Sequence, residues 1–308
     1  MELRTSTYTY LLGCPRTKTG VLIDSTLDRC EADLKTATEM GVNVKFALET
    51  HIHADHVTGA KKLKSLKSDI KSITGAASCE CDRVIKDNEI IQIGDLQLLC
   101  LHTPGHTKNC YSFVTVPGKE MVFTGDALLI RGCGRTGKPI FFFCLKKDFQ
   151  EGNYKLLHKA VNEKLFTLPD DCIVWPGHNY AGEVQSTIGE EKKFNPRLGN
   201  GKGVEEFGKL MDDVHKRIIK PKFLEYSVTN NLKGGKKRGD VGIFENFFFL
   251  PSSSGLFKEQ NKLSNDRCKC GYCRCFKKFV TLQNGFQLVL QIIYTVKHLV
   301  GKQNIPFF

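Results

Sequence analysis

The stretch THIHADH, residues 50–56, places three histidines and an aspartate within seven residues. The whole chain of 308 residues has only nine histidines, so scatter would not produce this density. Four ionisable side chains crowded into one loop repel one another or lose their hydrogen-bond partners unless a positive charge organises them. The stretch follows directly on residues 44–49, which have the composition of a short strand. The sequence therefore predicts a metal site at the end of a strand.

Residues 1–225 are patterned as alternating strands and helices. We expect paired strands at residues 7–13 and 19–26, and helices at 28–40 and 57–67. Further strands are expected in EIIQIGDLQLLCLH, YSFVTV and EMVFTGD. A polar motif follows each strand, and residues at the ends of adjacent strands converge in space even when they are far apart in sequence.

Seven side chains that follow strand-like segments are candidate metal ligands. They are His51, His53, Asp55 and His56 in the first loop, His106 in TPGH, Asp126 in TGD and His178 in PGH. Imidazole and carboxylate together suit zinc, iron or manganese, and no nearby CxxC pair indicates a structural thiolate site. For the isolated histidines, His102, His158, His215 and His298, we expect capping, core or surface roles.

The formal charge of +12 suggests a polyanion partner until its distribution is considered. Residues 227–308 hold 13 Lys or Arg against 4 Asp or Glu, a net of +9, and residues 137–147 add +3. The remainder is 12 − 9 − 3 = 0, so we expect no nucleic-acid partner for the main body.

Cysteine usage and hydropathy indicate the cellular compartment and whether a membrane is a partner. The thirteen cysteines are spread over the chain, their number is odd, and no signal peptide precedes them, so we expect reduced thiols in an intracellular compartment. No window reaches the roughly 18 uninterrupted apolar residues of a membrane span, so no membrane partner is expected. The N-terminus has no convincing transit peptide, because it passes within a few residues into a strand pattern.

The order HxHxDH, GH, GD, GH resembles the ligand signature of the metallo-β-lactamase superfamily, which implies a four-layer αββα sandwich of the α/β class. Further blocks narrow the resemblance to persulfide dioxygenases of the ethylmalonic encephalopathy protein type, which are similar to glyoxalase II. These blocks are STYTYLLG, THIHADHVTGA, TPGHT, FTGDALLIRGCGRT, DFQ, LFTLPDDC and NPRL. The resemblance covers residues 5–225.

This resemblance implies oxidation of glutathione persulfide by O₂ to sulfite and glutathione, a step of sulfide catabolism. It implies one Fe(II) per chain, held by His51, His106 and Asp126 as a 2-His-1-carboxylate triad. His53, Asp55, His56 and His178 would then surround the ligands as the remains of a second metal site. The alternative is a glyoxalase II-like thioester hydrolase with two zinc ions, which the ligand set alone does not exclude.

The resemblance also directs attention to residues that contact substrate. Arg135, in GCGRT, is the candidate for a glutathione carboxylate, since a guanidinium matches that group with two hydrogen bonds. Tyr180, two residues after His178, is expected to face the substrate, whereas Cys133 is expected to pack in the core. Relatives imply the mitochondrial matrix, with the cytoplasm as the alternative, and are compatible with a homodimer.

Two segments depart from the family pattern. Residues 137–147, GKPIFFFCLKK, separate GCGRT from DFQ. We interpret them as a short intron translated in frame. The alternatives are a hydrophobic loop that covers the site and an insert that impairs catalysis. Residues 226–308 form a basic tail that we expect to be disordered or a gene-model artefact. Its CKCGYCRC stretch, with Cys268, Cys270, Cys273 and Cys275, is too compact for the two pairs of a zinc finger.

Overall fold

The computed structural model describes residues 5–136, 152–217, 224–235, 273–281 and 287–296. The expected insert at 137–147, Cys268 and Cys270 lie outside the described residues. The chain divides into a main unit, residues 1–236 with 277–292, and a second unit, residues 237–276 with 293–308. Every site residue expected from the sequence lies in the main unit.

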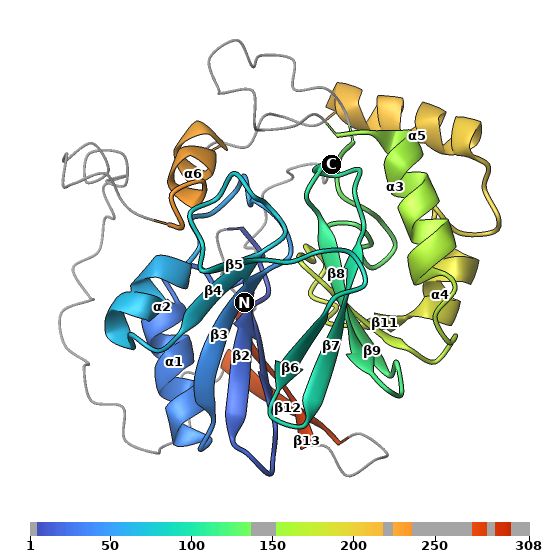
Figure 1. The fold of residues 1–308 in the computed structure, drawn as a ribbon. Helices are drawn as coiled ribbons and strands as arrows, with labels where there is room; N and C mark the ends of the chain where they lie inside the picture. Colours follow the sequence, from blue (N-terminus) through green and yellow to red (C-terminus); the bar gives the residue numbers. More distant parts are fainter. Residues whose placement is uncertain (1–4, 137–151, 218–223, 236–272, 282–286, 297–308) are drawn as a thin grey trace. The chain divides into compact units, whose positions relative to one another are not determined.

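Two β-sheets form the centre of the main unit (Figure 1). The first has the order β12-β13-β1-β2-β3-β4-β5, with strands β1 (Tyr10–Gly13), β2 (Thr19–Ile23), β3 (Asn43–Glu49), β4 (Lys71–Thr74), β5 (Arg83–Val84), β12 (Cys273–Thr281) and β13 (Gln287–Val296). The second has the order β11-β10-β9-β8-β7-β6, with strands β6 (Ile90–Ile93), β7 (Leu96–His102), β8 (Tyr111–Val116), β9 (Met121–Gly125), β10 (Ile173–Pro176) and β11 (Ser186–Thr187).

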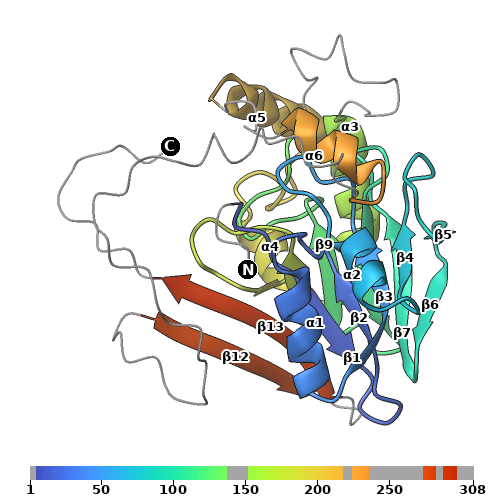
Figure 2. The same ribbon diagram turned by 90° about the vertical axis from the view of Figure 1, so that its left-hand side faces the viewer.

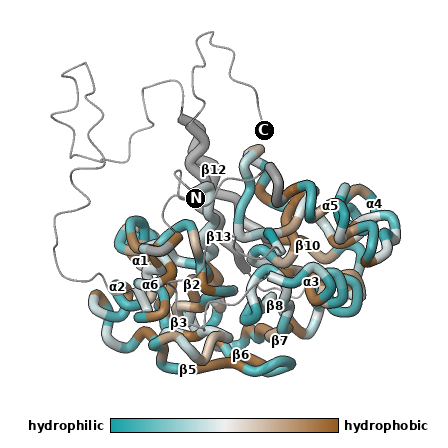
Figure 3. The backbone as a smooth tube through the Cα atoms, turned by 90° about the horizontal axis from the view of Figure 1, so that it is seen from above, coloured by the Kyte–Doolittle hydropathy of each residue, from teal (hydrophilic) through white to brown (hydrophobic). Residues whose placement is uncertain are grey.

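Helices cover the outer face of each sheet. Helices α1 (Cys30–Glu39) and α2 (Ala60–Leu66) lie against the first sheet (Figure 2). Helices α3 (Tyr154–Ala160), which continues as a π-helical turn η1 (Val161–Leu165), and α4 (Ile188–Phe194) lie against the second. Helix α5 (Val204–Arg217) packs on α3. Figure 3 shows hydrophilic and hydrophobic stretches alternating along these helices, as expected for helices with one face on a sheet. The layers are those of the predicted αββα sandwich.

Local sequence explains where the elements begin and end. Asn153 caps α3 by accepting hydrogen bonds from the backbone N–H groups of Lys155 and Leu156. Thr187 and Glu190 form a reciprocal capping box at the start of α4. Gly41 follows α1 with a φ of +71°, the left-handed conformation that commonly ends helices. The helix expected at residues 28–40 is therefore found with its ends shifted by only one or two residues.

The largest core cluster lies between the two sheets and is dominated by aromatic rings. Tyr10 on the first sheet contacts Phe123 and Trp175 on the second, with ring centroids 5.1 and 5.7 Å apart in edge-to-face arrangements. All three side chains are buried. Separate clusters lie beneath α1 and α2 and beneath α3 and α5. The sandwich therefore has three apolar layers, and the central one holds the two sheets together.

Within residues 226–308, expected to be disordered or a gene-model artefact, the structure describes three regular segments, namely most of helix α6 (Leu224–Asn231), β12 and β13. Helix α6 continues past residue 225, and the main unit extends to residue 236. Strand β13 pairs antiparallel with β1, with Tyr10 opposite Gln291. Scattered glutamines obscured the strand pattern of QLVLQIIYTV, whose backbone groups find partners on the free edge of β1. The boundary at 225 thus falls inside α6.

We expect Phe123→Ala to lower the free energy of unfolding by about 3–5 kcal/mol, because a buried ring is removed from the contact between the sheets. Phe194→Ala is the matched control, since Phe194 is 54% exposed and stacks only with Arg131 and Lys193. Loss of the Phe194 ring should lower the free energy of unfolding by no more than about 1 kcal/mol. Urea unfolding of the two variants measures both values, and equal losses would contradict this account of the core.

Candidate metal centre

The candidate ligands lie in loops that follow parallel strands. Strands β7, β9 and β10 run in one direction in the second sheet, and β2, β3 and β4 run in one direction in the first. His51 to His56 follow β3, His106 follows β7, Asp126 follows β9 and His178 follows β10. The carboxyl ends of these strands therefore bring the ligands from four separate loops to one edge.

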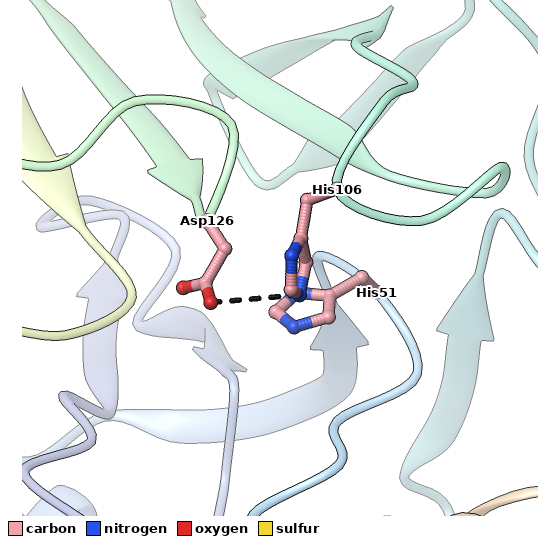
Figure 4. Close-up of side chains that lie close together, drawn as sticks. All are labelled: His51, His106 and Asp126. Carbon is pink, nitrogen blue, oxygen red and sulfur yellow. Dashed lines mark ion pairs between the residues drawn. The ribbon is translucent and has the colours of Figure 1, made fainter. Parts of the chain in front are cut away.

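His51, His106 and Asp126 form the most complete group. One ligand atom from each lies within 4.8 Å of the others. The Nε2 atom of His106 is 3.6 Å from Oδ2 of Asp126, and the rings of His51 and His106 are nearly perpendicular, at 87°. Figure 4 shows the three side chains converging from separate loops. The structure thus brings together the triad expected from the sequence.

Hydrogen bonds fix which nitrogen each histidine presents. The Nδ1 atom of His106 lies 2.9 Å from the carbonyl oxygen of Arg135, so Nδ1 carries the proton and Nε2 has the free lone pair. The Thr50 hydroxyl donates to Asp24 at 2.8 Å, so its oxygen accepts from Nδ1 of His51 at 2.9 Å. Both histidines therefore present Nε2 as the ligand atom.

Two glycines are needed because the backbone passes close to these ligands. A Cβ at Gly134 would lie 2.8 Å from Cγ of His106 and 2.6 Å from the carbonyl oxygen of Asp126. A Cβ at Gly177 would lie 2.8 Å from Oδ1 of Asp126. Side chains at these positions would displace the ligands, which explains the glycines within GCGRT and PGH.

The electrostatic environment prepares the triad to bind a cation. Burial lowers the pKa of His51 and of His106, and the neighbouring His53 lowers that of His51 further. Burial opposes ionisation of Asp126, but the facing histidines, His178 first, outweigh it and lower its pKa. Near neutral pH the triad therefore consists of two neutral imidazoles and one carboxylate.

His53 differs from the other histidines. Its Nε2 atom lies 3.2 Å from Oδ1 of Asp24 and 3.4 Å from Oε2 of Glu49. Burial alone would lower the pKa of His53, but these two carboxylates raise it well above its usual value. The two buried carboxylates therefore favour the protonated form of His53, which makes His53 a less ready ligand than His51 or His106.

The three remaining candidates border the triad on one side. Nδ1 of His56 lies 3.2 Å from Oδ2 of Asp55, and Nε2 of His178 lies 3.6 Å from Oδ1 of Asp126 and 3.8 Å from Oδ2 of Asp55. Ligand atoms of His53, Asp55 and His56 also lie within 4.8 Å of one another, as do those of Asp24, Glu49 and His53. The geometry, like the sequence, is therefore compatible with either one or two metal ions.

Two buried polar atoms fit a bound cation. Within the described part of the chain, Oδ1 of Asp126 and Nε2 of His56 have no hydrogen-bond partner. Leaving such an atom unsatisfied costs about 1–3 kcal/mol, and more when it is charged. Two imidazole nitrogens and a carboxylate form a donor set typical of Fe(II) or zinc. The residues present therefore fit a divalent metal ion.

The candidates for substrate contact lie beside the centre. Arg135 is half-buried, and its backbone carbonyl holds His106. Tyr180 is 79% exposed, and its ring is stacked parallel to that of His178, 6.1 Å away. Cys133 is buried, with its thiol 3.8 Å from the sulfur of Met211, and burial raises its pKa to about 11. Cys133 therefore has the environment of a packing residue.

Four residues at the site were not expected from the sequence. They are Thr7, whose hydroxyl donates to Asp55 at 3.1 Å, Asp24, Glu49 and Asn231. The signal for Asp24 and Glu49 was available, because both are acidic residues at the carboxyl ends of apolar strands. Asn231 had no such signal, since it lies in the segment that was assigned to a disordered tail.

Metal binding at pH 7 should release about zero protons if the ligands are His51, His106 and Asp126, since the two imidazoles are neutral and the carboxylate is ionised. Recruitment of protonated His53 would release about one proton. Calorimetric titration of the metal-free chain in buffers of different ionisation enthalpy measures this number. Affinity should stay level as the pH falls through 6.5 and decline only below it, because burial lowers the pKa of both ligand histidines. Release of a full proton would contradict the three-ligand assignment.

Comparisons with known proteins agree with this geometry. The metallo-beta-lactamase superfamily model matches residues 4–72 and 80–178. The mitochondrial persulfide dioxygenase ETHE1 of Bos taurus is 40% identical over 235 residues, which cover 76% of this chain and 86% of the relative. A probable hydroxyacylglutathione hydrolase, glo2 of Schizosaccharomyces pombe, is 32% identical over 61% of this chain and 81% of its own length.

A solved structure extends the comparison to three dimensions. The crystal structure of ETHE1 from Myxococcus xanthus superposes with a TM-score of 0.69 at 35% identity, covering 77% of this chain and 97% of the other. The matched regions hold His51, His106, Asp126 and His178. The chain belongs to the metallo-beta-lactamase superfamily and, within it, to the persulfide dioxygenase family of enzymes.

Proposed function

We propose that this chain is an iron-dependent dioxygenase that converts glutathione persulfide, O₂ and water into sulfite and glutathione. The observation that carries the proposal is the arrangement of His51, His106 and Asp126, in which both histidines present Nε2 beside one carboxylate. Such a triad would hold one Fe(II) ion and leave coordination positions open for exchangeable ligands. The activity named for the Bos taurus and Myxococcus xanthus relatives supports the same assignment.

Iron would supply the electronic chemistry, since ground-state O₂ reacts slowly with closed-shell sulfur and a redox-active metal overcomes this barrier. The protein's own residues orient the site. Asp24, acting through Thr50, and the carbonyl of Arg135 hold the imidazole rings of the two ligand histidines in one orientation. The exposed Tyr180 and the half-buried Arg135 are our candidates for contact with a charged peptide such as glutathione.

A second candidate is a glutathione-thioester hydrolase with two zinc ions. It is favoured by the additional grouping of His53, Asp55 and His56 and by the more distant fission-yeast relative. The proton held on His53 between Asp24 and Glu49 opposes it, because a second ion that used this ring would have to displace that proton. We therefore favour the mononuclear iron centre.

One experiment separates the two activities. Purified anaerobically, the chain should contain about one iron, and it should consume O₂ only when glutathione persulfide is present. His106→Ala should abolish both iron retention and O₂ uptake, since it removes one of three ligands. Two zinc ions with hydrolysis of a glutathione thioester would support the second candidate. Bound metal with neither activity would point to an impairing insert, and deletion of residues 137–147 should then restore turnover.

Arg135→Lys should raise KM for glutathione persulfide by about tenfold, because a lysine keeps the charge but not the paired hydrogen bonds to a carboxylate. A small alkyl persulfide without carboxylates is the control substrate, and its KM should be the same for both enzymes. The backbone carbonyl that holds His106 is unaffected by this substitution. Steady-state O₂ uptake measures both constants, and an equal change for both substrates would exclude a carboxylate contact.

We also propose a mitochondrial location, because the relatives from Bos taurus and Homo sapiens are named as mitochondrial proteins. Among the described residues, no helix combines the length and the hydropathy that crossing a membrane requires. Cell fractionation with antibodies to the chain tests the location. Recovery of the chain outside the mitochondrial fraction would contradict it.

A further inference from the structure

Residues 224–235, which comprise α6 and the turn after it, contact the ligand loop directly, and we name this segment the clasp. The side-chain amide of Asn231 donates to the carbonyl oxygens of His53 at 2.9 Å and His56 at 2.8 Å. Its side-chain oxygen accepts from the backbone N–H of Thr58 at 2.8 Å. Asn231 is only 4% exposed. One buried amide therefore holds three backbone groups across the HIHADH loop.

The rest of the clasp also lies close to α2 and to the loops after β3 and β4. The carbonyl oxygen of Leu232 accepts from Glu80 N–H at 2.9 Å, and that of Gly234 accepts from Lys61 N–H at 3.1 Å. A Cβ at Gly235 would lie 2.2 Å from the carbonyl oxygen of Thr58. Figures 1 and 2 both show α6 above α2, in agreement with the contact to Lys61. The clasp therefore fits the loops after β3 and β4 closely.

Apolar contacts fix the helix that carries Asn231. Leu224 and Val228, on one side of α6, form a small buried cluster with Ile52 and Ala76. Ile52 lies between His51 and His53, so this cluster and the amide of Asn231 hold the same loop. A side-chain amide fixed by its own helix is a more rigid anchor than a water molecule, because its atoms move only with the packed helix.

The loop needs such an anchor because it has no regular secondary structure. Residues 51–58 lie between β3 and α2, where an isolated bridge pairs Thr58 with Thr26. The carbonyl groups of His53 and His56 lie outside any ladder or helix and accept from Asn231 instead. The loop is also held by the hydroxyl of Thr58, which donates to Glu49, and by Asp24, which accepts from the N–H of Thr50 at 2.7 Å. Asn231 completes this support from the side of the clasp.

We propose that Asn231 is a positioning residue of the metal centre: by fixing the backbone of the HIHADH loop, it sets the geometry of His51 and the lifetime of the bound metal. This inference rests on the metal-binding part of the proposed function and not on the reaction catalysed. Groups that orient metal ligands change metal affinity or activity by about 10- to 100-fold when they are lost. A purely structural role would instead lower stability and leave the bound metal unchanged.

Asn230 provides a matched control. It is also an asparagine in α6 and is only 6% exposed, but its side-chain amide donates to the carbonyl oxygen of Tyr226, at 2.7 Å, within the clasp itself. Replacing Asn230 removes a buried amide of the same size without removing a bond to the ligand loop. Comparison of the two positions therefore separates positioning from general stability.

The experiment uses the full chain, loaded with Co(II) as a spectroscopic probe, in the wild type and in the Asn231→Ala, Asn231→Asp and Asn230→Ala variants. Visible absorption reports the ligand geometry, and the rate of Co(II) loss to excess chelator reports the lifetime of the site. We expect Asn231→Ala to shift the absorption bands and to speed metal loss by about 10- to 100-fold. Asn230→Ala should keep the wild-type spectrum and rate, even if its urea midpoint falls as far.

Asn231→Asp keeps the acceptor for Thr58 but replaces the amide donor by an oxygen that faces two carbonyl groups, so it should resemble Asn231→Ala. It also tests the proposal if the alanine variant fails to fold. Wild-type spectra and rates in the folded Asn231 variants, equal changes in Asn230→Ala, or no Co(II) binding by the wild type would overturn the proposal. Persulfide-dependent O₂ uptake by the iron-loaded wild type is measured separately, and its absence would contradict the dioxygenase assignment alone.

Discussion

The packing of one sheet against the other is the constraint on which the site depends. Tyr10 of the first sheet meets Phe123 and Trp175 of the second at ring distances of 5.1 and 5.7 Å, and this contact fixes the relative position of the strands that precede the ligands. His51 comes from the first sheet, whereas Asp126 follows β9 of the second. A triad drawn from both sheets can keep its geometry only while the aromatic layer between them stays closely packed.

Charge then separates the histidines into two kinds. His51 and His106 are buried beside one carboxylate and stay neutral near pH 7, with their Nδ1 protons committed to Thr50 and the Arg135 carbonyl. His53 lies between two carboxylates that raise its pKa and favour its protonated form. Asp24 takes part in both arrangements, since its two oxygens contact Thr50 and His53. One buried aspartate therefore orients a ligand and keeps a neighbouring ring from acting as one.

The backbone around the ligands is held as tightly as their side chains. Gly134 and Gly177 allow the chain to pass within contact distance of His106 and Asp126, where any side chain would displace them. Asn231 supports the HIHADH loop from the clasp with three hydrogen bonds. These contacts explain why residues far apart in sequence act as one site.

The sequence by itself determined the candidate ligand types and the strand that precedes each of them, because apolar periodicity and the HxHxDH spacing are local properties of the chain. The sandwich fold followed from the resemblance of the motif order to the metallo-β-lactamase superfamily. The sequence also indicated Cys133 as a packing residue. It did not indicate the proton on His53, since that depends on Asp24 and Glu49, which reach the ring only after the chain has folded. Nor did it indicate the role of Asn231, 178 residues from His53, or the pairing of β13 with β1. Only the tertiary structure decided these features, because a hydrogen bond between distant segments leaves no periodic trace in either one.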